Sequence, residues 1–177
     1  MKNLLILGMI FLMACGSSKN GMQEVKGPFD GSSYRSNGRY FRAVASGESQ
    51  NMETAKSKAL LLANQRLASA VQTEMKSVSE SYINERNLGT PADFGERFQQ
   101  LTREVLSTSL SDVRTIGNKT YVRKDNVYVQ WVALEMHKKD YYKRIQLRLA
   151  DQKNLSEQER KVVEKMIEKA IEDSEKE

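Results

Sequence analysis

Histidine and cysteine, which supply much of the nucleophilic and metal-binding chemistry of proteins, each occur once in this 177-residue chain, as His137 and Cys15. One histidine cannot build a multi-histidine metal site. A serine–histidine pair stays open, although His137 stands in a charged stretch that favours a surface position. Paired carboxylates such as Glu157 and Glu159 lie in a highly charged helix, where a solvated face is the simpler interpretation, and no glycine-rich phosphate loop follows a predicted strand. We therefore predict no catalytic residue, no metal and no cofactor.

The setting of Cys15 predicts covalent modification of its thiol. An apolar run of eleven residues, Leu4 to Ala14, follows a single positive charge at Lys2. It is shorter than the roughly 20 residues that cross a bilayer as a helix, and it suits the core of a secretory signal. Its end, Leu12-Met13-Ala14-Cys15, resembles the lipobox of bacterial lipoproteins. The resemblance implies that residues 1–14 are removed and that the thiol takes a thioether-linked diacylglycerol; the alternative is a stray cysteine after an export signal.

Acylation of Cys15 would decide both the anchor and the redox chemistry of the mature chain. Two or more acyl chains hold a protein stably on a membrane. No cysteine is then left for a disulfide, so the domain depends on its apolar core. Residues 16–18, Gly-Ser-Ser, lack the aspartate that commonly retains lipoproteins in the inner membrane. We therefore expect an outer-membrane location, with the periplasmic and surface faces both open.

Composition divides the rest of the chain into a linker and a folded part. Residues 16–36 are rich in Gly and Ser without an apolar period, which is typical of a flexible tether that would span roughly 25 Å. We expect the lipidated cysteine and tether over residues 15–37, an α+β domain over 38–153, and a C-terminal amphipathic charged helix over 154–177.

Apolar periodicity predicts the first elements of that domain. The stretch 39–45 has the β-favouring composition of a strand. From Ser49, a candidate N-cap, apolar residues recur at steps of three and four as far as Val78. This pattern predicts one long amphipathic helix, in which Ala55, Ala59 and Ala63 would allow a close approach to a sheet.

Later patterns complete the predicted fold. The stripe from Phe94 to Val105 predicts a shorter helix, and Val113–Ile116 a brief strand. Tyr121–Lys124 should pair with Val127–Met136 across the two-residue turn Asp125-Asn126. A capping box, Ser156 to Glu159, starts the last helix. The predicted fold is α+β: a small, mainly antiparallel sheet of three to four strands packed against the long helix, with additional C-terminal helices.

Basic and aromatic residues interleave near the end of the domain, as they do in polyanion sites. Because an export signal argues against nucleic acid, we consider Lys138, Lys139, Lys143 and Arg144 candidates for binding lipid headgroups, lipopolysaccharide or peptidoglycan. The alternative is that this stretch packs near the acidic last helix. Residues 112–153 hold ten basic and five acidic side chains, and residues 155–177 hold five and eight. Trp131 invites a ligand-stacking role, but its apolar neighbours favour the core.

Several short motifs can be set beside a known family: a strand ending in Ala45-Ser46-Gly47, the alanine-bearing helix, Ser111-Asp112-Val113, and Tyr128-Val129 leading into residues 131–134. Together they resemble the twenty-kilodalton outer-membrane lipoprotein family, to which flagellar disc and ring lipoproteins are related. The resemblance covers about residues 38–142. It implies a compact α+β domain tethered to the outer membrane, and as partners further copies of the chain or a larger envelope complex.

Two functions follow as expectations. The favoured one is a lipid-anchored outer-membrane lipoprotein that acts as a non-enzymatic structural or assembly component of the cell envelope. The alternative is an accessory periplasmic or surface binder of a polyanionic envelope ligand. The stripe from Val162 to Ile171 in the last helix leaves two arrangements open, docking on its own domain or a coiled-coil seam with another copy.

Overall fold

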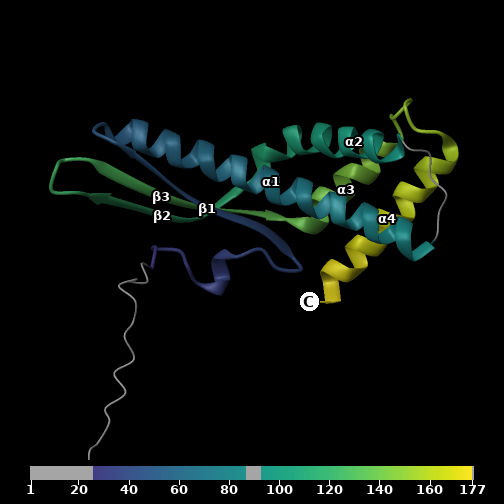
Figure 1. Ribbon diagram of the computed structural model, residues 1–177, viewed down its shortest axis with the longest axis horizontal. Coiled ribbons are helices and arrows are strands. Elements are labelled where there is room, and N and C mark those ends of the chain that lie inside the picture. Colours follow the sequence, from purple (N-terminus) through teal and green to yellow (C-terminus); the bar gives the residue numbers. More distant parts are fainter. Residues whose placement is uncertain (1–25, 87–92, 177) are drawn as a thin grey trace, which may run out of the picture.

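The computed structural model describes residues 26–86 and 93–176. The predicted signal and Cys15 lie outside these residues. The described chain is α+β, and Figure 1 shows its sheet at one end of the long helix α1 and the other helices at the opposite end. In chain order the elements are η1 (Ser32–Tyr34), β1 (Tyr40–Ser49), α1 (Met52–Arg86), α2 (Phe94–Ser109), η2 (Leu110–Asp112), β2 (Arg114–Val122), β3 (Tyr128–His137), α3 (Lys138–Leu149) and α4 (Glu157–Lys176).

The sheet has three antiparallel strands in the order β1-β3-β2, which confirms the predicted fold class. The stretches Val113–Ile116 and Tyr121–Lys124, predicted separately, belong mainly to one strand, β2, whose register shifts between Thr115 and Gly117. Such a bulge interrupts the alternation of faces, and for this reason the sequence pattern divided one strand into two.

The hairpin between β2 and β3 closes through a longer loop than the predicted two-residue turn. The Arg123 N–H donates to the Val127 carbonyl at 2.9 Å, and the Asn126 N–H donates to the Arg123 carbonyl at 3.0 Å. Asn126 has φ 59°. A three-residue loop that ends in a left-handed residue is a common hairpin solution, and Asn tolerates that conformation better than most residues.

One face of the sheet, the inner face, lies against α1. Burial alternates along β1, with Phe41, Ala43 and Ala45 buried, as expected for a strand covered on this side. The backbones approach closely at Gly47, where an added Cβ would lie 2.5 Å from both the carbonyl oxygen of Ala55 and the amide nitrogen of Ala59. The predicted close approach of the alanine stripe to the sheet is thereby confirmed.

The first turn of α1 is capped by a residue other than the predicted one. The Oδ1 of Asn51 accepts a hydrogen bond from the Thr54 N–H at 3.0 Å, which is the N-cap interaction. Ser49 is instead the last residue of β1. Because β1 extends through Ser49, the helix starts later than predicted, and Asn51 takes the capping position.

The opposite, outer face of the sheet is partly covered by the N-terminal segment, residues 26–38, a part of the chain predicted to be tether. Phe29 is buried, and its ring packs so closely on β2 that an added Cβ at Gly117 would lie 2.6 Å from it. The Ser36 Oγ accepts a hydrogen bond from the Arg42 N–H of β1 at 2.9 Å. The boundary expected near residue 38 is therefore corrected: the folded domain includes Phe29. Figure 1 shows this segment on the side of the strands opposite α1.

Trp131 belongs to the outer face and is only partly buried, so the expected core position is wrong. Its cross-strand neighbours are Ser46 on β1 and Lys119 on β2. Val132 and Leu134, which follow Trp131 at one and three residues, are buried on the inner face. Adjacent strand residues point to opposite faces, so apolar neighbours in the chain need not surround a side chain in space.

The second half of α1 lies among the other helices. Leu67, Val71 and Met75 belong to the same core cluster as the buried residues of α2, α3 and α4. In α4 the predicted capping box is confirmed: the Ser156 N–H donates to the Glu159 carboxylate at 2.8 Å, and the Glu159 N–H donates to the Ser156 Oγ at 3.3 Å. Val163, Met166 and Ile167 of α4 are buried in this core, so the last helix docks on its own domain.

Candidate functional site

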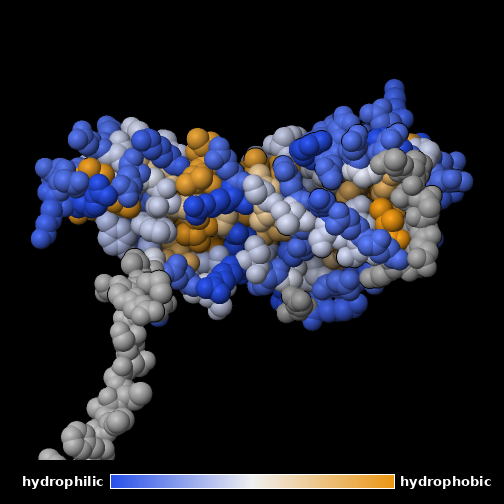
Figure 2. All heavy atoms as spheres, viewed as in Figure 1, coloured by the Kyte–Doolittle hydropathy of each residue, from blue (hydrophilic) through white to orange (hydrophobic). Residues whose placement is uncertain are grey.

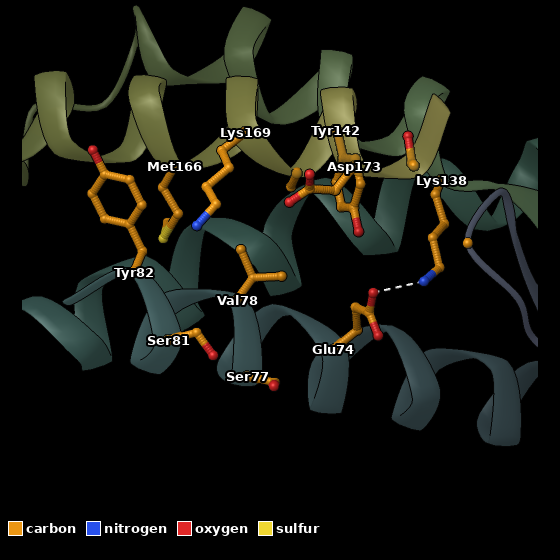
Figure 3. A pocket seen from close by; sticks show the side chains of 13 residues that line it. Glu74, Ser77, Val78, Ser81, Tyr82, Lys138, Tyr142, Met166, Lys169 and Asp173 are labelled. Carbon is orange, nitrogen blue, oxygen red and sulfur yellow. Dashed lines mark hydrogen bonds and ion pairs between the residues drawn. The ribbon is translucent and has the colours of Figure 1, made fainter. Parts of the chain in front are cut away.

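A groove of about 300 Å³ runs between α1 and α4 and ends at the start of α3. Figure 3 shows side chains from all three helices pointing into it. Its lining mixes apolar and polar groups, with Val78, Tyr82, Met166 and Ala170 beside Glu74, Ser77, Ser81, Lys138, Tyr142, Lys169, Asp173 and Ser174.

An ion pair closes the α3 end of this groove. The Nζ of Lys138 lies 2.6 Å from the Oε1 of Glu74, and the Lys138 side chain is only 9% exposed. The same ammonium stands over the ring of Phe41, 5.0 Å from its centroid. A cation held by a carboxylate and an aromatic face is compensated on two sides, which allows its burial.

Tyr142 adds a fixed donor beside that pair. Burial raises the pKa of Tyr142 well above its usual range, and the negative charge of Glu74 raises it further. The phenol is therefore neutral near pH 7 and can donate a hydrogen bond. Glu74, Lys138 and Tyr142 form a charged and polar end wall, next to an apolar floor of Val78, Met166 and Ala170.

The side chains that line the groove are suited to binding a ligand. Hydroxyls at Ser77 and Ser81 and charges at Lys169 and Asp173 can orient a ligand, and the apolar floor can bury part of it. Sequence analysis singled out Lys138 but missed Glu74. Glu74 lies three residues after Val71 and four before Val78, on the same side of the helix as the buried stripe. This spacing is the signal from which a semi-buried carboxylate could have been predicted.

The four predicted polyanion-binding residues do not form one open patch. Lys138 is buried against Glu74, Lys139 pairs with Glu175 of α4, and Arg144 pairs with Asp112 of η2, whereas Lys143 is exposed. The pairing with Lys139, together with the charge of Lys143, lowers the pKa of Glu175. The alternative interpretation, a basic helix packed near the acidic last helix, describes the observed contact between α3 and α4.

His137 lies at a second cavity, of about 470 Å³, which the end of the sheet forms with η2 and the start of α3. Its Nδ1 is 3.9 Å from the Oδ2 of Asp140, and the Tyr40 ring meets the imidazole edge-on. The serine that lines this cavity, Ser109, donates its hydroxyl to the Val105 carbonyl at 2.8 Å. No hydrogen bond in the described part of the chain joins His137 to a serine.

The described residues also bear on metal binding and on membrane spanning. Within residues 26–86 and 93–176, no three His, Cys, Asp or Glu side chains come together as a metal site would require. In the same residues, none of the helices combines the length and the apolar character needed to cross a bilayer.

Comparison with known proteins adds a distant structural similarity. No protein-family model and no curated protein matches the sequence. Among solved structures, the secreted protein HP1454 from the human pathogen Helicobacter pylori matches with 19% sequence identity and a TM-score of 0.33. The match covers 76% of this chain and 52% of HP1454, so the chain spans about half the length of that protein. A TM-score this low does not indicate a shared fold.

Proposed function

We propose that this protein is a lipid-anchored outer-membrane lipoprotein that serves as a non-enzymatic assembly component of the cell envelope. The observation that carries the proposal is the sequence Leu12-Met13-Ala14-Cys15 at the end of a short apolar run. The resemblance of its short sequence motifs to those of the twenty-kilodalton outer-membrane lipoprotein family supports the same assignment.

The number of residues between Cys15 and the folded domain limits how far the domain can lie from the membrane. Eleven peptide links separate Cys15 from Lys26, where the described segment starts. Even fully extended, this stretch spans at most about 40 Å. The domain would therefore work within one domain diameter of the lipid surface, as suits a component that organises neighbours at the membrane.

The α1–α4 groove supports a role in binding other proteins. Its open, mixed lining resembles the polar rim and apolar centre of an interaction site. A segment with a small apolar side chain beside a polar or charged group would match both the floor and the end wall. We propose this groove as the place where the assembly partner docks.

The anchor is tested by expressing the full chain and its Cys15→Ser variant in bacteria. We expect the wild-type N-terminal peptide to begin at Cys15, to carry the mass of its acyl chains, and to fractionate with the outer membrane. The variant should lose both the added mass and the fractionation. A wild-type chain that keeps residues 1–14 or carries no lipid would contradict the proposal.

The assembly role is tested by photo-crosslinking in cells. A photoreactive amino acid at Ser77 should give a defined product with the partner, because this side chain lines the groove. The same group at exposed Lys153 serves as the matched control. In addition, Ala170→Trp should fill the groove and remove the Ser77 product. Equal products from both positions, or an unchanged product in Ala170→Trp, would reject the groove as the docking site.

A further inference from the structure

The net positive charge of the domain is confined to its sheet half. Residues 26–50 and 113–137, which form the N-terminal segment and the three strands, contain eight basic and four acidic side chains. The rest of the chain after residue 50, which forms the helices, contains eighteen of each. The molecule is therefore polarised, with a positive sheet half and a neutral helical half.

The carboxylates of the sheet half are all engaged within the structure. Asp30 accepts a hydrogen bond from the Gly27 N–H, Glu135 pairs with Arg42, and both Glu48 and Asp125 pair with Arg123. Among the described residues, no carboxylate pairs with Lys119 or Lys124, and both lysines are exposed. Their charge is available to an outside partner.

Aromatic side chains stand beside Lys119 on the outer face of the sheet, and Lys124 lies in the hairpin loop that follows β2. Lys119 is the direct cross-strand neighbour of Trp131, and Tyr121, which is 47% exposed, follows on the same face of β2. We call Lys119, Tyr121, Lys124 and Trp131 the outer patch. Tryptophan and tyrosine beside lysine is the combination that favours the headgroup layer of a membrane.

The chain from the anchor arrives at this patch. At Gly27 an added Cβ would lie 3.2 Å from the ring of Trp131, and the Nζ of Lys119 stands 5.7 Å from the centroid of the Phe29 ring. The segment that leads back to Cys15 thus leaves the domain beside the outer patch. Figure 2 shows that apolar side chains also reach the surface in the sheet half, near the start of α1 and the strands.

We propose that the outer patch rests on the anionic lipid surface in which the acyl chains of Cys15 are embedded. This inference rests on the proposed function, because the anchor supplies the proximity. Each lysine near an anionic headgroup layer contributes about 1 kcal/mol of binding. The α1–α4 groove is lined by the second half of α1, at the opposite end of that helix from the sheet (Figure 1), so contact of the outer patch with lipid leaves the groove open for a partner.

The test uses the mature chain from residue 15, coupled through Cys15 to a maleimide lipid in vesicles. Attachment is then imposed chemically, so the result does not depend on lipidation in cells. Trp131 is the only tryptophan, and its fluorescence reports the patch directly. We expect headgroup-spin-labelled lipid to quench Trp131 in vesicles rich in phosphatidylglycerol, and much less in phosphatidylcholine alone.

Charge-reversal variants make the test specific. K119E/K124E should abolish the quenching that depends on phosphatidylglycerol, whereas K161E/K165E on α4 makes the same charge change in the helical half and should retain it. Because Lys119 contacts Phe29, Lys124→Glu alone provides a second variant outside that contact, and it should lower the quenching partially. For the uncoupled Cys15→Ser chain, K119E/K124E should weaken binding to phosphatidylglycerol vesicles, measured by sedimentation, at least about thirtyfold, since the two lysines contribute about 1 kcal/mol each and the introduced carboxylates are repelled.

Two outcomes would overturn the inference. One is equal quenching of Trp131 in both kinds of vesicle. The other is shielding of Trp131 from both spin-labelled lipid and aqueous iodide, because such shielding would indicate that a second protein copy covers the patch. Either would leave the anchor intact. Absence of lipid on Cys15 in cells would reject the proposed function instead, and the coupled vesicles would still report on the patch.

Discussion

Lys138 and Glu74 form an ion pair between residues 64 positions apart in sequence, with 2.6 Å between Nζ and Oε1. Lys138 starts α3 directly after the end of β3, and Glu74 lies in the second half of α1. The pair therefore links α1 to the point where the chain passes from β3 into α3. Since the lysine is buried, it depends on this one carboxylate.

Removal of Glu74 should destabilise the fold because it leaves the Lys138 ammonium buried without its partner. We expect Glu74→Ala to lower the free energy of unfolding by about 2 kcal/mol, measured by urea denaturation. Glu80→Ala is the matched control, since Glu80 is exposed and pairs with Lys76 only at 3.8 Å. It should change stability by less than about 0.5 kcal/mol. In a double-mutant cycle with Lys138→Met, additive losses would contradict a direct interaction.

The contact of α1 with β1 should tolerate no side chain at Gly47. Because an added Cβ would meet backbone atoms of Ala55 and Ala59, Gly47→Ala should push α1 away and cost about 3 kcal/mol. Gly95→Ala offers the opposite case: it lies inside α2, with nothing within 4 Å of the added Cβ. There alanine should stabilise the protein by about 0.5 to 1 kcal/mol. Thermal unfolding of both variants measures these changes. If the melting temperature changes equally in the two variants, α1 and β1 do not approach each other as closely as described.

The N-terminal segment should contribute to stability, as a tether would not. Phe29→Ala removes a buried ring from the outer face of the sheet, and we expect a loss of about 2 to 3 kcal/mol. Leu147→Ala is the control, because Leu147 is 77% exposed. Hydrogen exchange should also show faster exchange at the Arg42 amide, which donates to Ser36. If Phe29→Ala unfolds at the same urea concentration as wild type, the segment is not part of the fold.

Acid should weaken the start of α4. The Arg97 guanidinium, with the Ser156 N–H, holds the pKa of Glu159 below its usual value of 4.5. The unfolded chain therefore takes up this proton before the folded chain does. The stability that Glu159 contributes is fully present above about pH 4.5 and is lost as the pH falls through the lowered folded value. Chemical unfolding across this range should show a smaller acid-induced loss in Glu159→Gln than in wild type. The exposed control Glu168→Gln should follow wild type; a Glu159→Gln curve parallel to wild type would refute the linkage.

The local sequence determined the features that depend only on residues close together in the chain. The capping box at Ser156 and Glu159 needs residues three apart, and the stripe Ala55, Ala59 and Ala63 needs only a helical period. Both are observed as predicted, and the α+β fold with its antiparallel hairpin followed from the same kind of pattern. The anchor at Cys15 is also a purely local motif, and it stays a prediction.

The features that only the tertiary structure decided depend on partners far away in the chain. Phe29 stands in a Gly- and Ser-rich stretch, and it is buried because β2 offers a bare Gly117 opposite it. Lys138 was predicted as one of four surface cations, but in the folded chain it pairs with Glu74 of α1. Trp131 was expected in the core, but it lies on the outer face of its strand and is only partly buried. Propensity and periodicity act between neighbours in sequence, whereas burial and ion pairing act between neighbours in space. The sequence alone could therefore predict the elements and the anchor, while the groove, the polarised charge and the outer patch required the assembled fold.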